Sequence, residues 1–383
     1  MLKSILLVSC LFCASAAVAR DRIVAIGLEA DARLIGSDAV PPEQVKPDQV
    51  VFFDFSAGKP RRIGTVDVPV SFQGPPAGIA ISADRKRAFV PAANGRGSGG
   101  SANTLVPIDI LSVVDLSGGM PRVAQTMHVG MGATSAALSP DGGLLVVTHA
   151  DDNAATLLRV SGKRVEIVRR ISFGAGARPL AAVFLPDGKS LAITLAGKNR
   201  TALYRWRGTE IEPAPFREIS TGLYPASFAV CGKTGLAVVG NFGTVSGDLD
   251  TLSLIDLNAN PIRAIDTVTV GPSPEGLDCS GDGRFVVTAN QNMSTIDHAD
   301  PLYSPNSEVV LLAIRDRKLV VTDRAKIGIW AQGAVFASDD LIAAESIADR
   351  RLHLFRRVED RLVRMESIAF ENGGPATLGR SAD

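Results

Sequence analysis

The chain has 383 residues, and 46% of them are hydrophobic, a proportion that supports a folded core and argues against a disordered chain. Lysine plus arginine number 40 and aspartate plus glutamate number 40, so the formal net charge is zero. This balance argues against a nucleic-acid-binding protein, which needs a strong positive field. The 37 glycines and 22 prolines follow no collagen-like period and indicate a turn-rich fold.

The first 19 residues have the pattern of an export signal. Lys3 gives the positive start, residues 5–14 are apolar, and Ala17 and Ala19 form a small-x-small cleavage site before Arg20. No later segment approaches 18 uninterrupted apolar residues, so we expect no membrane span. We therefore predict a signal peptide over 1–19, one domain over 20–383, and a location in the periplasm or outside the cell. The alternative is a lipid anchor at Cys10.

The rest of the chain repeats one pattern, in which an apolar alternating run is followed by a turn and three further β-rich runs. The turn residues of successive copies lie 46–57 positions apart and are Asp84, Asp141, Asp187, Thr234, Asp282 and Asp339. Four short strands per unit, with no sustained 3.6-residue stripe, are typical of β-propeller blades. A β-sandwich seldom keeps one turn motif at such regular spacing, and the coils of a β-helix are much shorter.

The two ends of the chain supply a seventh unit. Residues 374–383 have the pattern of a first strand, whereas residues 22–27, 50–55 and 61–68 have that of a second, third and fourth strand. Pairing them would close the ring and leave no unpaired sheet edge. We therefore predict an all-β protein, a seven-bladed β-propeller closed by strands from both termini.

The repeats also resemble those of a known group. The run SPDGGLLVVTHADDNAATLLRV and the tetrapeptide Val287-Thr288-Ala289-Asn290 resemble the YVTN-type repeats of lactonase-like and amine-dehydrogenase-heavy-chain-like propellers. The resemblance covers nearly the whole mature chain. It implies a propeller, and its group includes binding proteins, lactone hydrolases and subunits of redox enzymes, so it leaves the function open.

Lactonase members of this group usually open a blade with a Gly-Pro-Arg-His segment. The matching stretch here ends in Ala177-Arg178-Pro179, which keeps the arginine and has proline in place of histidine. The resemblance thus implies Arg178 as an electrostatic stabiliser. His149 or His298 would then be the general base, because imidazole titrates near neutral pH.

In a propeller, the connections from second to third strand and from fourth to first strand emerge on one face, around the channel mouth. Long insertions on this face, over residues 28–48, 94–103 and 290–307, predict a lid or a partner surface. Both His149 and His298 fall in second-to-third-strand loops of this face, over residues 149–153 and 290–307. The alternatives are unselected loop length and solvated histidines.

Residues at the channel mouth form a candidate ligand site. We predict a small polar ligand held by an aromatic and charged set, which is Arg178, Tyr224, Glu275, Trp330, Asn241 and Asn290. The alternative is that these residues pack between blades.

The same loops carry acidic residues that suit a divalent cation such as Ca²⁺. They are Asp248, Asp250, Asp297 and Asp300, with His298 beside them, and the alternative is a set of solvated acids. No other cofactor is predicted, because the sequence has no zinc spacing, P-loop, dinucleotide fingerprint or c-type haem motif.

Two cysteines remain after cleavage of the signal. Cys231 and Cys279 occupy nearly equivalent positions late in the first strands of adjacent blades. They either form a disulfide, worth about 2–4 kcal/mol, or stay as two small buried thiols.

Three functions follow from these observations. We favour an exported binding or scaffold protein that holds a small polar ligand or a periplasmic protein partner through its looped face. The first alternative is a lactonase-like hydrolase or lyase with its site at the channel mouth. The second is the scaffold subunit of a periplasmic dehydrogenase.

Overall fold

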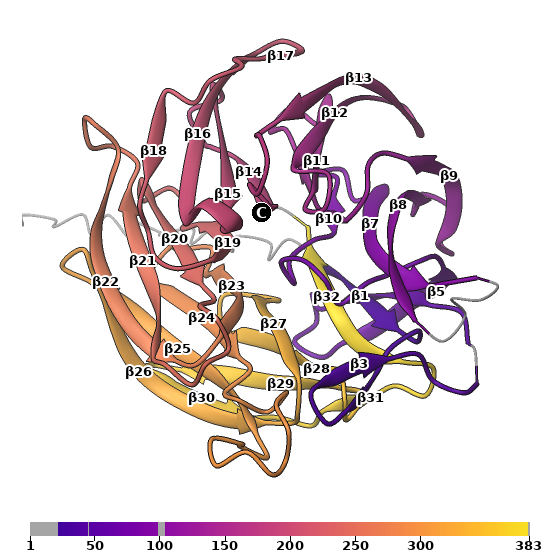
Figure 1. Ribbon diagram of the computed structural model, residues 1–383, viewed down its shortest axis with the longest axis vertical. Helices are drawn as coiled ribbons and strands as arrows, with labels where there is room; N and C mark the ends of the chain where they lie inside the picture. The colour runs from indigo at the N-terminus through magenta and orange to yellow at the C-terminus, as the bar shows by residue number, and fades with distance from the viewer. Residues whose placement is uncertain (1–21, 45, 99–103, 382–383) are drawn as a thin grey trace, which may run out of the picture.

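The computed structural model describes residues 22–44, 46–98 and 104–381, and Figure 1 shows their strands arranged as radial sheets around a central axis. The predicted signal peptide and lipid-anchor cysteine lie outside the described residues, as do parts of the insertions 28–48 and 94–103. Seven sheets of four or five strands form the blades, so the predicted propeller is confirmed. Within the described ranges, no helix has the length and apolar character needed to cross a membrane.

Six blades are built from consecutive antiparallel strands, with the innermost strand first. Blades 1 to 3 are β6 (Ala80–Ile81), β7 (Arg87–Arg96), β8 (Leu105–Asp115) and β9 (Arg122–His128); β10 (Ala133–Leu138), β11 (Leu144–His149), β12 (Ala154–Ser161) and β13 (Arg164–Ser172); and β14 (Pro179–Phe184), β15 (Ser190–Leu195), β16 (Arg200–Arg207), β17 (Glu210–Ile211) and β18 (Arg217–Ile219). A short 3₁₀ turn, η2 (Ala196–Lys198), joins β15 to β16.

Blades 4 to 6 repeat the arrangement. They are β19 (Pro225–Val230), β20 (Leu236–Asn241), β21 (Asp250–Asp256) and β22 (Arg263–Gly271); β23 (Pro274–Cys279), β24 (Phe285–Asn290), β25 (Ser307–Arg315) and β26 (Lys318–Ile327); and β27 (Ala331–Phe336), β28 (Leu341–Ser346), β29 (Arg351–Val358), β30 (Arg361–Arg364) and β31 (Ile368–Ala369). In blades 3 and 6 two short segments share the place of the fourth strand.

The closing blade contains strands from both ends of the chain, as the sequence predicted. Its order is β32 (Gly374–Arg380), β1 (Ile23–Glu29), β4 (Gln49–Asp54) and β5 (Arg61–Asp67). β32 runs antiparallel to β1, with Leu378 opposite Ile26. The insertion between β1 and β4 contains a hairpin of β2 (Arg33–Ile35) and β3 (Asp38–Val40).

The turn between the first and second strands has a local cause in the motif Ser-x-Asp. In blade 1, Ser82 Oγ donates to Asp84 Oδ1, which also accepts from the backbone N–H of Lys86. Such side-chain bonds replace backbone ones in tight turns. In blade 6 the acceptor is Asp340, whose Oδ1 accepts from Ser338 Oγ at 2.8 Å. The turn residue is therefore Asp340, one position after the predicted Asp339.

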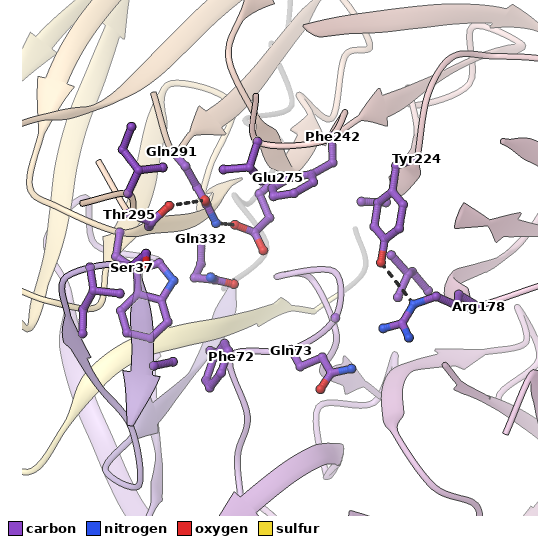
Figure 2. Close-up of a pocket in the computed structure, with 18 residues that line it drawn as sticks. Ser37, Phe72, Gln73, Arg178, Tyr224, Phe242, Glu275, Gln291, Thr295 and Gln332 are labelled. Carbon is purple, nitrogen blue, oxygen red and sulfur yellow. Dashed lines mark hydrogen bonds between the residues drawn. The ribbon is translucent and has the colours of Figure 1, made fainter. Parts of the chain in front are cut away.

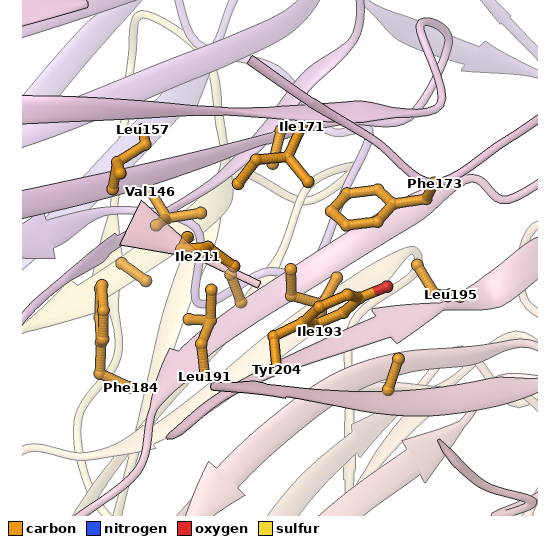
Figure 3. Close-up of a cluster of buried hydrophobic side chains, with 14 of the residues drawn as sticks. Val146, Leu157, Ile171, Phe173, Phe184, Leu191, Ile193, Leu195, Tyr204 and Ile211 are labelled. Atoms are coloured by element: carbon orange, nitrogen blue, oxygen red, sulfur yellow. The ribbon is translucent and has the colours of Figure 1, made fainter. Parts of the chain in front are cut away.

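The core lies between blades rather than in one centre. Figure 3 shows one such layer, in which Val146 and Leu157 of blade 2 pack against Phe184, Leu191 and Ile193 of blade 3. A blade sheet is covered on both faces by its neighbours, which explains why its second strand is a continuous apolar run. This packing fixes the inner strands rigidly around the axis.

A disulfide crosslinks blades 4 and 5. The Sγ atoms of Cys231 and Cys279 are 2.03 Å apart and their Cα atoms 4.9 Å apart, and both side chains are buried. Cys231 follows β19 and Cys279 ends β23, so the bond joins the inner strands of two neighbouring blades. Of the two alternatives that the sequence allowed, a disulfide or two free thiols, the structure contains the disulfide.

Candidate functional site

A cavity of about 420 Å³ opens where the inner strands of blades 3 to 6 begin. Its lining includes Arg178, Tyr224, Glu275 and Trp330, so the structure brings together these four residues of the predicted ligand set. The β2–β3 hairpin and residues 72–74, which precede β6, line it as well. The cavity therefore lies on the face where the sequence placed the long connections.

The backbone at the start of each inner strand directs the lining side chains. Arg178, Tyr224 and Trp330 each directly precede an inner strand and have left-handed backbone angles, with φ of 43°, 51° and 61°. This conformation is costly for residues other than glycine and persists only where the surroundings hold it. In this protein, side-chain oxygens accept hydrogen bonds from the backbone N–H groups of these residues and hold the conformation.

These oxygens come from the second-to-third-strand loops. Asn153 Oδ1 accepts from the backbone N–H of Arg178 at 3.0 Å, and Asn199 Oδ1 accepts from that of Tyr224 at 2.9 Å. The strained residues are thus fixed by the neighbouring loop, which pre-organises their side chains at the rim.

A β-bulge follows in the inner strand and turns further side chains into the cavity. The register of β23 against β24 shifts between Pro274 and Gly276, which leaves Glu275 without a cross-strand partner. The register of β27 shifts between Ala331 and Ala334, and Gln332 lies within this shift. Because a bulge re-aims side chains, both residues line the cavity rather than the blade interface.

One wall of the cavity is a connected polar network around Glu275 (Figure 2). Glu275 Oε2 accepts from Gln291 Nε2 at 2.6 Å, and Gln291 Oε1 accepts from Thr295 Oγ1 at 3.0 Å. With its amide oriented to satisfy its neighbours, Gln332 donates to Glu275 Oε1 at 3.1 Å and accepts from Trp330 Nε1 at 3.1 Å. Both carboxyl oxygens of Glu275 are therefore held in place.

Burial determines the protonation of this wall. Desolvation raises the pKa of Glu275 to about 8, although its bonds with the two glutamines oppose the shift. Behind it lies Glu345 in β28, whose pKa is raised well above its ordinary value by burial and then by the charge of Glu275. At pH 7 the Glu275 carboxyl therefore keeps its proton and can donate it.

The opposite wall carries the positive charge. Arg178 Nε donates to Tyr224 Oη at 3.3 Å, and Arg178 Nη1 lies 3.5 Å from Asp151 Oδ1. The Arg178 side chain keeps 40% of its surface exposed, so it can still reach a ligand. Tyr224 contacts the ring of Phe242 at a centroid distance of 6.0 Å, which gives this wall an apolar surface beside the guanidinium.

His149 does not belong to this site, contrary to its predicted role as a loop base. It ends β11, is fully buried, and its Nε2 lies 2.8 Å from Thr156 Oγ1. Burial, followed by the charge of Arg170, lowers its pKa to about 4. The side chain lies beneath Gly130, where an added Cβ would be 2.8 Å from the imidazole ring.

Asn241 and Asn290 also differ from their predicted role in ligand binding. They end β20 and β24 and are buried. Asn241 Nδ2 donates to Thr251 Oγ1 at 3.0 Å, and Asn290 Nδ2 donates to Val270 O at 2.8 Å. Both amides tie strands together and do not line the cavity.

The predicted metal ligands and His298 are not assembled into a site. His298, Asp248, Asp297 and Asp300 are exposed, and His298 contacts the ring of Tyr303. Asp250 accepts from the backbone N–H of Ser273 at 2.9 Å, a structural bond. Among the described residues, the acidic group close enough to hold an ion is a different one.

The sequence missed several lining residues, of which Gln291, Gln332 and Phe72 matter most. Gln332 lies two positions after Trp330, just as Glu275 lies two positions after the left-handed residue Ser273. This shared spacing was a usable signal. Gln291 follows Asn290 by one position, so the prediction chose the neighbouring amide.

Comparison with known proteins supports the fold assignment. No protein-family model matches the sequence, and no curated protein matches it either. The structure resembles a 6-phosphogluconolactonase-like protein of Bacteroides fragilis, with a TM-score of 0.70, 13% identity, and 95% of this chain and 99% of that chain covered.

Two further structures extend the comparison. The periplasmic gluconolactonase of Pseudomonas aeruginosa has a TM-score of 0.66 at 16% identity, with 94% of this chain and 99% of that chain covered. The hydrazine synthase of Kuenenia stuttgartiensis has a TM-score of 0.56 at 15% identity and covers 76% and 78%. The chain is thus a seven-bladed β-propeller whose structural neighbours include lactonase propellers. At these identities the likeness shows the fold alone.

Proposed function

We propose that this protein binds a small, hydroxylated anion, such as a sugar acid or a phosphorylated sugar acid, in the cavity at the channel mouth. The observation that carries the proposal is the opposition of two walls, with Arg178 on one side and the Glu275 network on the other. Arginine binds carboxylates through paired, charge-assisted hydrogen bonds. Protonated Glu275 and the amides of Gln291 and Gln332 suit hydroxyl groups, which both donate and accept.

The size and apolar parts of the cavity agree with such a ligand. Its volume of about 420 Å³ is within the range of small-molecule sites. Phe72 contacts Trp330 edge-on at a centroid distance of 5.1 Å, and both residues line the cavity. Rings of this kind cover the C–H surface of a sugar derivative while polar groups fix its orientation.

A titration tests the binding function. Sugar acids, phosphorylated sugar acids and sugar lactones would be titrated into the protein by calorimetry, with neutral sugars as the comparison. We expect at least one anionic member to bind more tightly than its neutral counterpart, because of Arg178. If no member binds, or if neutral and charged members bind equally, the proposal is wrong.

Lactone hydrolysis is a second candidate, and the pairing of Arg178 with a protonated carboxyl favours it. Water would attack the lactone carbonyl carbon, and Arg178 would stabilise the oxyanion that forms. As the ring C–O bond breaks, Glu275 would give its proton to the leaving oxygen, and the new carboxylic acid would return one proton from the attacking water to Glu275 and release the other to solvent. Proton release during turnover of a lactone panel measures this activity, and Glu275→Gln should abolish it while leaving sugar-acid binding in place.

We also propose that the protein works in the periplasm or outside the cell. The pattern of residues 1–19 supports export, and the Cys231–Cys279 bond suits an oxidising compartment. Fractionation of cells that express the full chain checks this, and recovery of the protein in the cytoplasm with residues 1–19 intact would contradict it. The role of the looped face in holding a protein partner stays a prediction.

A further inference from the structure

Three carboxylates gather where the insertion between β1 and β4 begins and ends. Glu29 is the last residue of β1, Asp31 lies two positions later, and Asp48 directly precedes β4. Each offers an oxygen, and these oxygens lie within 4.8 Å of one another. Glu29 and Asp48 are buried, with 1% and 8% of their surfaces exposed, and Asp31 is half-buried.

The hydrogen bonds around the cluster leave one buried oxygen without a partner. Asp48 accepts from the backbone N–H groups of Ala30, at 2.7 Å, and Val70, at 3.0 Å. Glu29 Oε1 accepts from the N–H of Asp31 at 2.8 Å, whereas Glu29 Oε2 accepts nothing from the described part of the chain. A buried, unsatisfied carboxylate oxygen beside two further carboxylates is costly unless something binds it.

Two cationic side chains near the cluster are turned to other acceptors. Lys46 Nζ donates to Glu371 O at 3.3 Å, and Arg96 Nη1 donates to Pro42 O at 3.2 Å. Asp31 Oδ2 accepts from the backbone N–H of Arg96 at 3.3 Å, a contact with blade 1. Within the described ranges, Glu29 Oε2 therefore has no hydrogen-bond donor that would offset the proximity of the other two acids.

We propose that Glu29, Asp31 and Asp48 bind a Ca²⁺ ion at the seam between the closing blade and blade 1. Oxygen is the ligand that this ion prefers, and two oxygens at 2.3–2.6 Å on opposite sides of Ca²⁺ are about 5 Å apart. The three oxygens lie within 4.8 Å of one another, close enough for one such ion to contact all of them. Asp31 and Asp48 line a cavity of about 680 Å³, from which water can complete the shell.

The ion would join elements that are distant in sequence. Glu29 belongs to the closing blade, Asp31 contacts β7 through Arg96, and Asp48 is bonded to Val70. The β2–β3 hairpin between Asp31 and Asp48 lines the cavity that contains Arg178. Calcium would therefore stabilise this seam and the part of the cavity rim that the hairpin forms.

Calorimetric titration with Ca²⁺ and thermal unfolding of chelator-treated protein test the proposal. At a Ca²⁺ concentration a hundredfold above Kd, we expect Tm to rise by about 3–4 °C. Glu29→Gln keeps the shape of the side chain and removes one charge. It should raise Tm without Ca²⁺, because the cost of burying this acid, and then its repulsion from Asp48, is removed, and it should weaken Ca²⁺ binding at least tenfold.

Controls separate this site from weak binding to surface acids. Asp248→Asn removes an exposed acid and should keep the full Ca²⁺ response, and Asp31→Asn repeats the test if Glu29→Gln fails to fold. Mg²⁺ at equal concentration should shift Tm less. Lack of heat and of a Tm shift with Ca²⁺ in the wild type, an undiminished response in both cluster variants, or an equal shift with Mg²⁺ would overturn the proposal.

Discussion

His149 and Asn290 end the second strands of two blades, whereas Arg178 and Trp330 directly precede the innermost strands of two others. All four lie at the same end of the propeller, where connections of both kinds meet. The first pair is buried, with His149 bonded to Thr156 of its own blade and Asn290 bonded to Val270 O of the preceding blade, and the second pair lines the cavity. The same face of one fold thus carries polar residues with opposite roles.

Backbone geometry explains the difference. Arg178 and Trp330 have left-handed φ angles, and their side chains line the cavity. His149 and Asn290 end regular strands, beneath the glycines of the incoming connection, where a Cβ on Gly271 would lie 3.1 Å from Asn290 Nδ2. Position relative to the bulge and the left-handed residue, rather than polarity, therefore marks a residue as part of the site.

The largest expected effect is on the pH dependence of stability. Glu275 has a folded pKa of about 8 against an ordinary value of 4.5, so between these values the folded state binds a proton that the unfolded chain has released. The free energy of unfolding should therefore fall as pH rises from 4.5 to 8, by a few kcal/mol. Urea unfolding across this range measures the slope.

Glu275→Gln should make this fall shallower, and the remaining slope combines Glu345, Glu29 and Asp48, whose pKa values are also raised, with the opposite contribution of His149. The exposed Glu366 provides the control, because Glu366→Gln should leave the slope unchanged. An identical slope in wild type and Glu275→Gln would contradict the assignment of a proton to Glu275.

Replacing His149 should have the next largest effect, and on stability alone. His149→Ala empties buried volume and removes a partner of Thr156, which should lower the free energy of unfolding by about 2–4 kcal/mol. Folding lowers the pKa of His149, whereas it raises that of Glu275. The stability that neutral His149 contributes is therefore lost as pH falls from 6.5 toward 4. Denaturant unfolding at pH 7 measures the variant.

The exposed His298 is the matched control. His298→Ala should change stability by less than about 0.5 kcal/mol. If His149→Ala abolished ligand binding in a folded protein of near-normal stability, the assignment of His149 to the blade interior would be wrong.

A smaller, selective loss should follow removal of the cavity arginine. Arg178→Ala should weaken binding of an anionic ligand about 10–100-fold, because a charge-assisted contact is lost. Stability should change by less than about 1 kcal/mol, since the side chain is 40% exposed. Calorimetric titration of both proteins gives the affinity ratio.

Arg170→Ala provides the comparison for Arg178, because Arg170 also pairs with an aspartate, Asp152, and keeps 53% of its surface exposed, but does not line the cavity. It should leave affinity unchanged. Equal losses in the two variants would mean that long-range charge, and not contact in the cavity, governs binding.

The smallest effect is expected in the acidic loop. Asp300 is exposed and accepts a local bond from the N–H of Leu302 at 2.8 Å. Asp300→Asn should change stability by less than about 0.5 kcal/mol and leave ligand affinity as in the wild type. If the titration showed a loss of affinity above threefold, the loop that contains Asp300 would contribute to ligand binding after all.

The sequence contained most of the fold because each blade is a local unit with its own turn. In blades 1, 2, 5 and 6 a Ser-x-Asp bond closes the hairpin locally, and the repeat of apolar runs follows from packing between neighbouring blades. The offset between Asp339 and Asp340 arose because two aspartates are adjacent there, and only the one two positions after Ser338 accepts its hydroxyl.

The site was partly predictable because the order of strands in each blade fixes which connections reach the channel mouth. Connectivity alone places Arg178 and Trp330 at the mouth, whereas Gln332 enters through a bulge that depends on cross-strand register. Asn290 was mistaken for a loop residue because the strand boundary falls one position later. The group of Glu29, Asp31 and Asp48 was not predicted, since folding of the insertion brings together residues up to 19 positions apart.

The most direct test of the central claim is a crystal structure with the anionic sugar derivative that binds most tightly in the titration. We expect density for the ligand in the cavity, with its anionic group at Arg178 and hydroxyl groups at Glu275 and Gln291. A saturated complex whose ligand lies on the outer loops, or anywhere other than between these two walls, would contradict it.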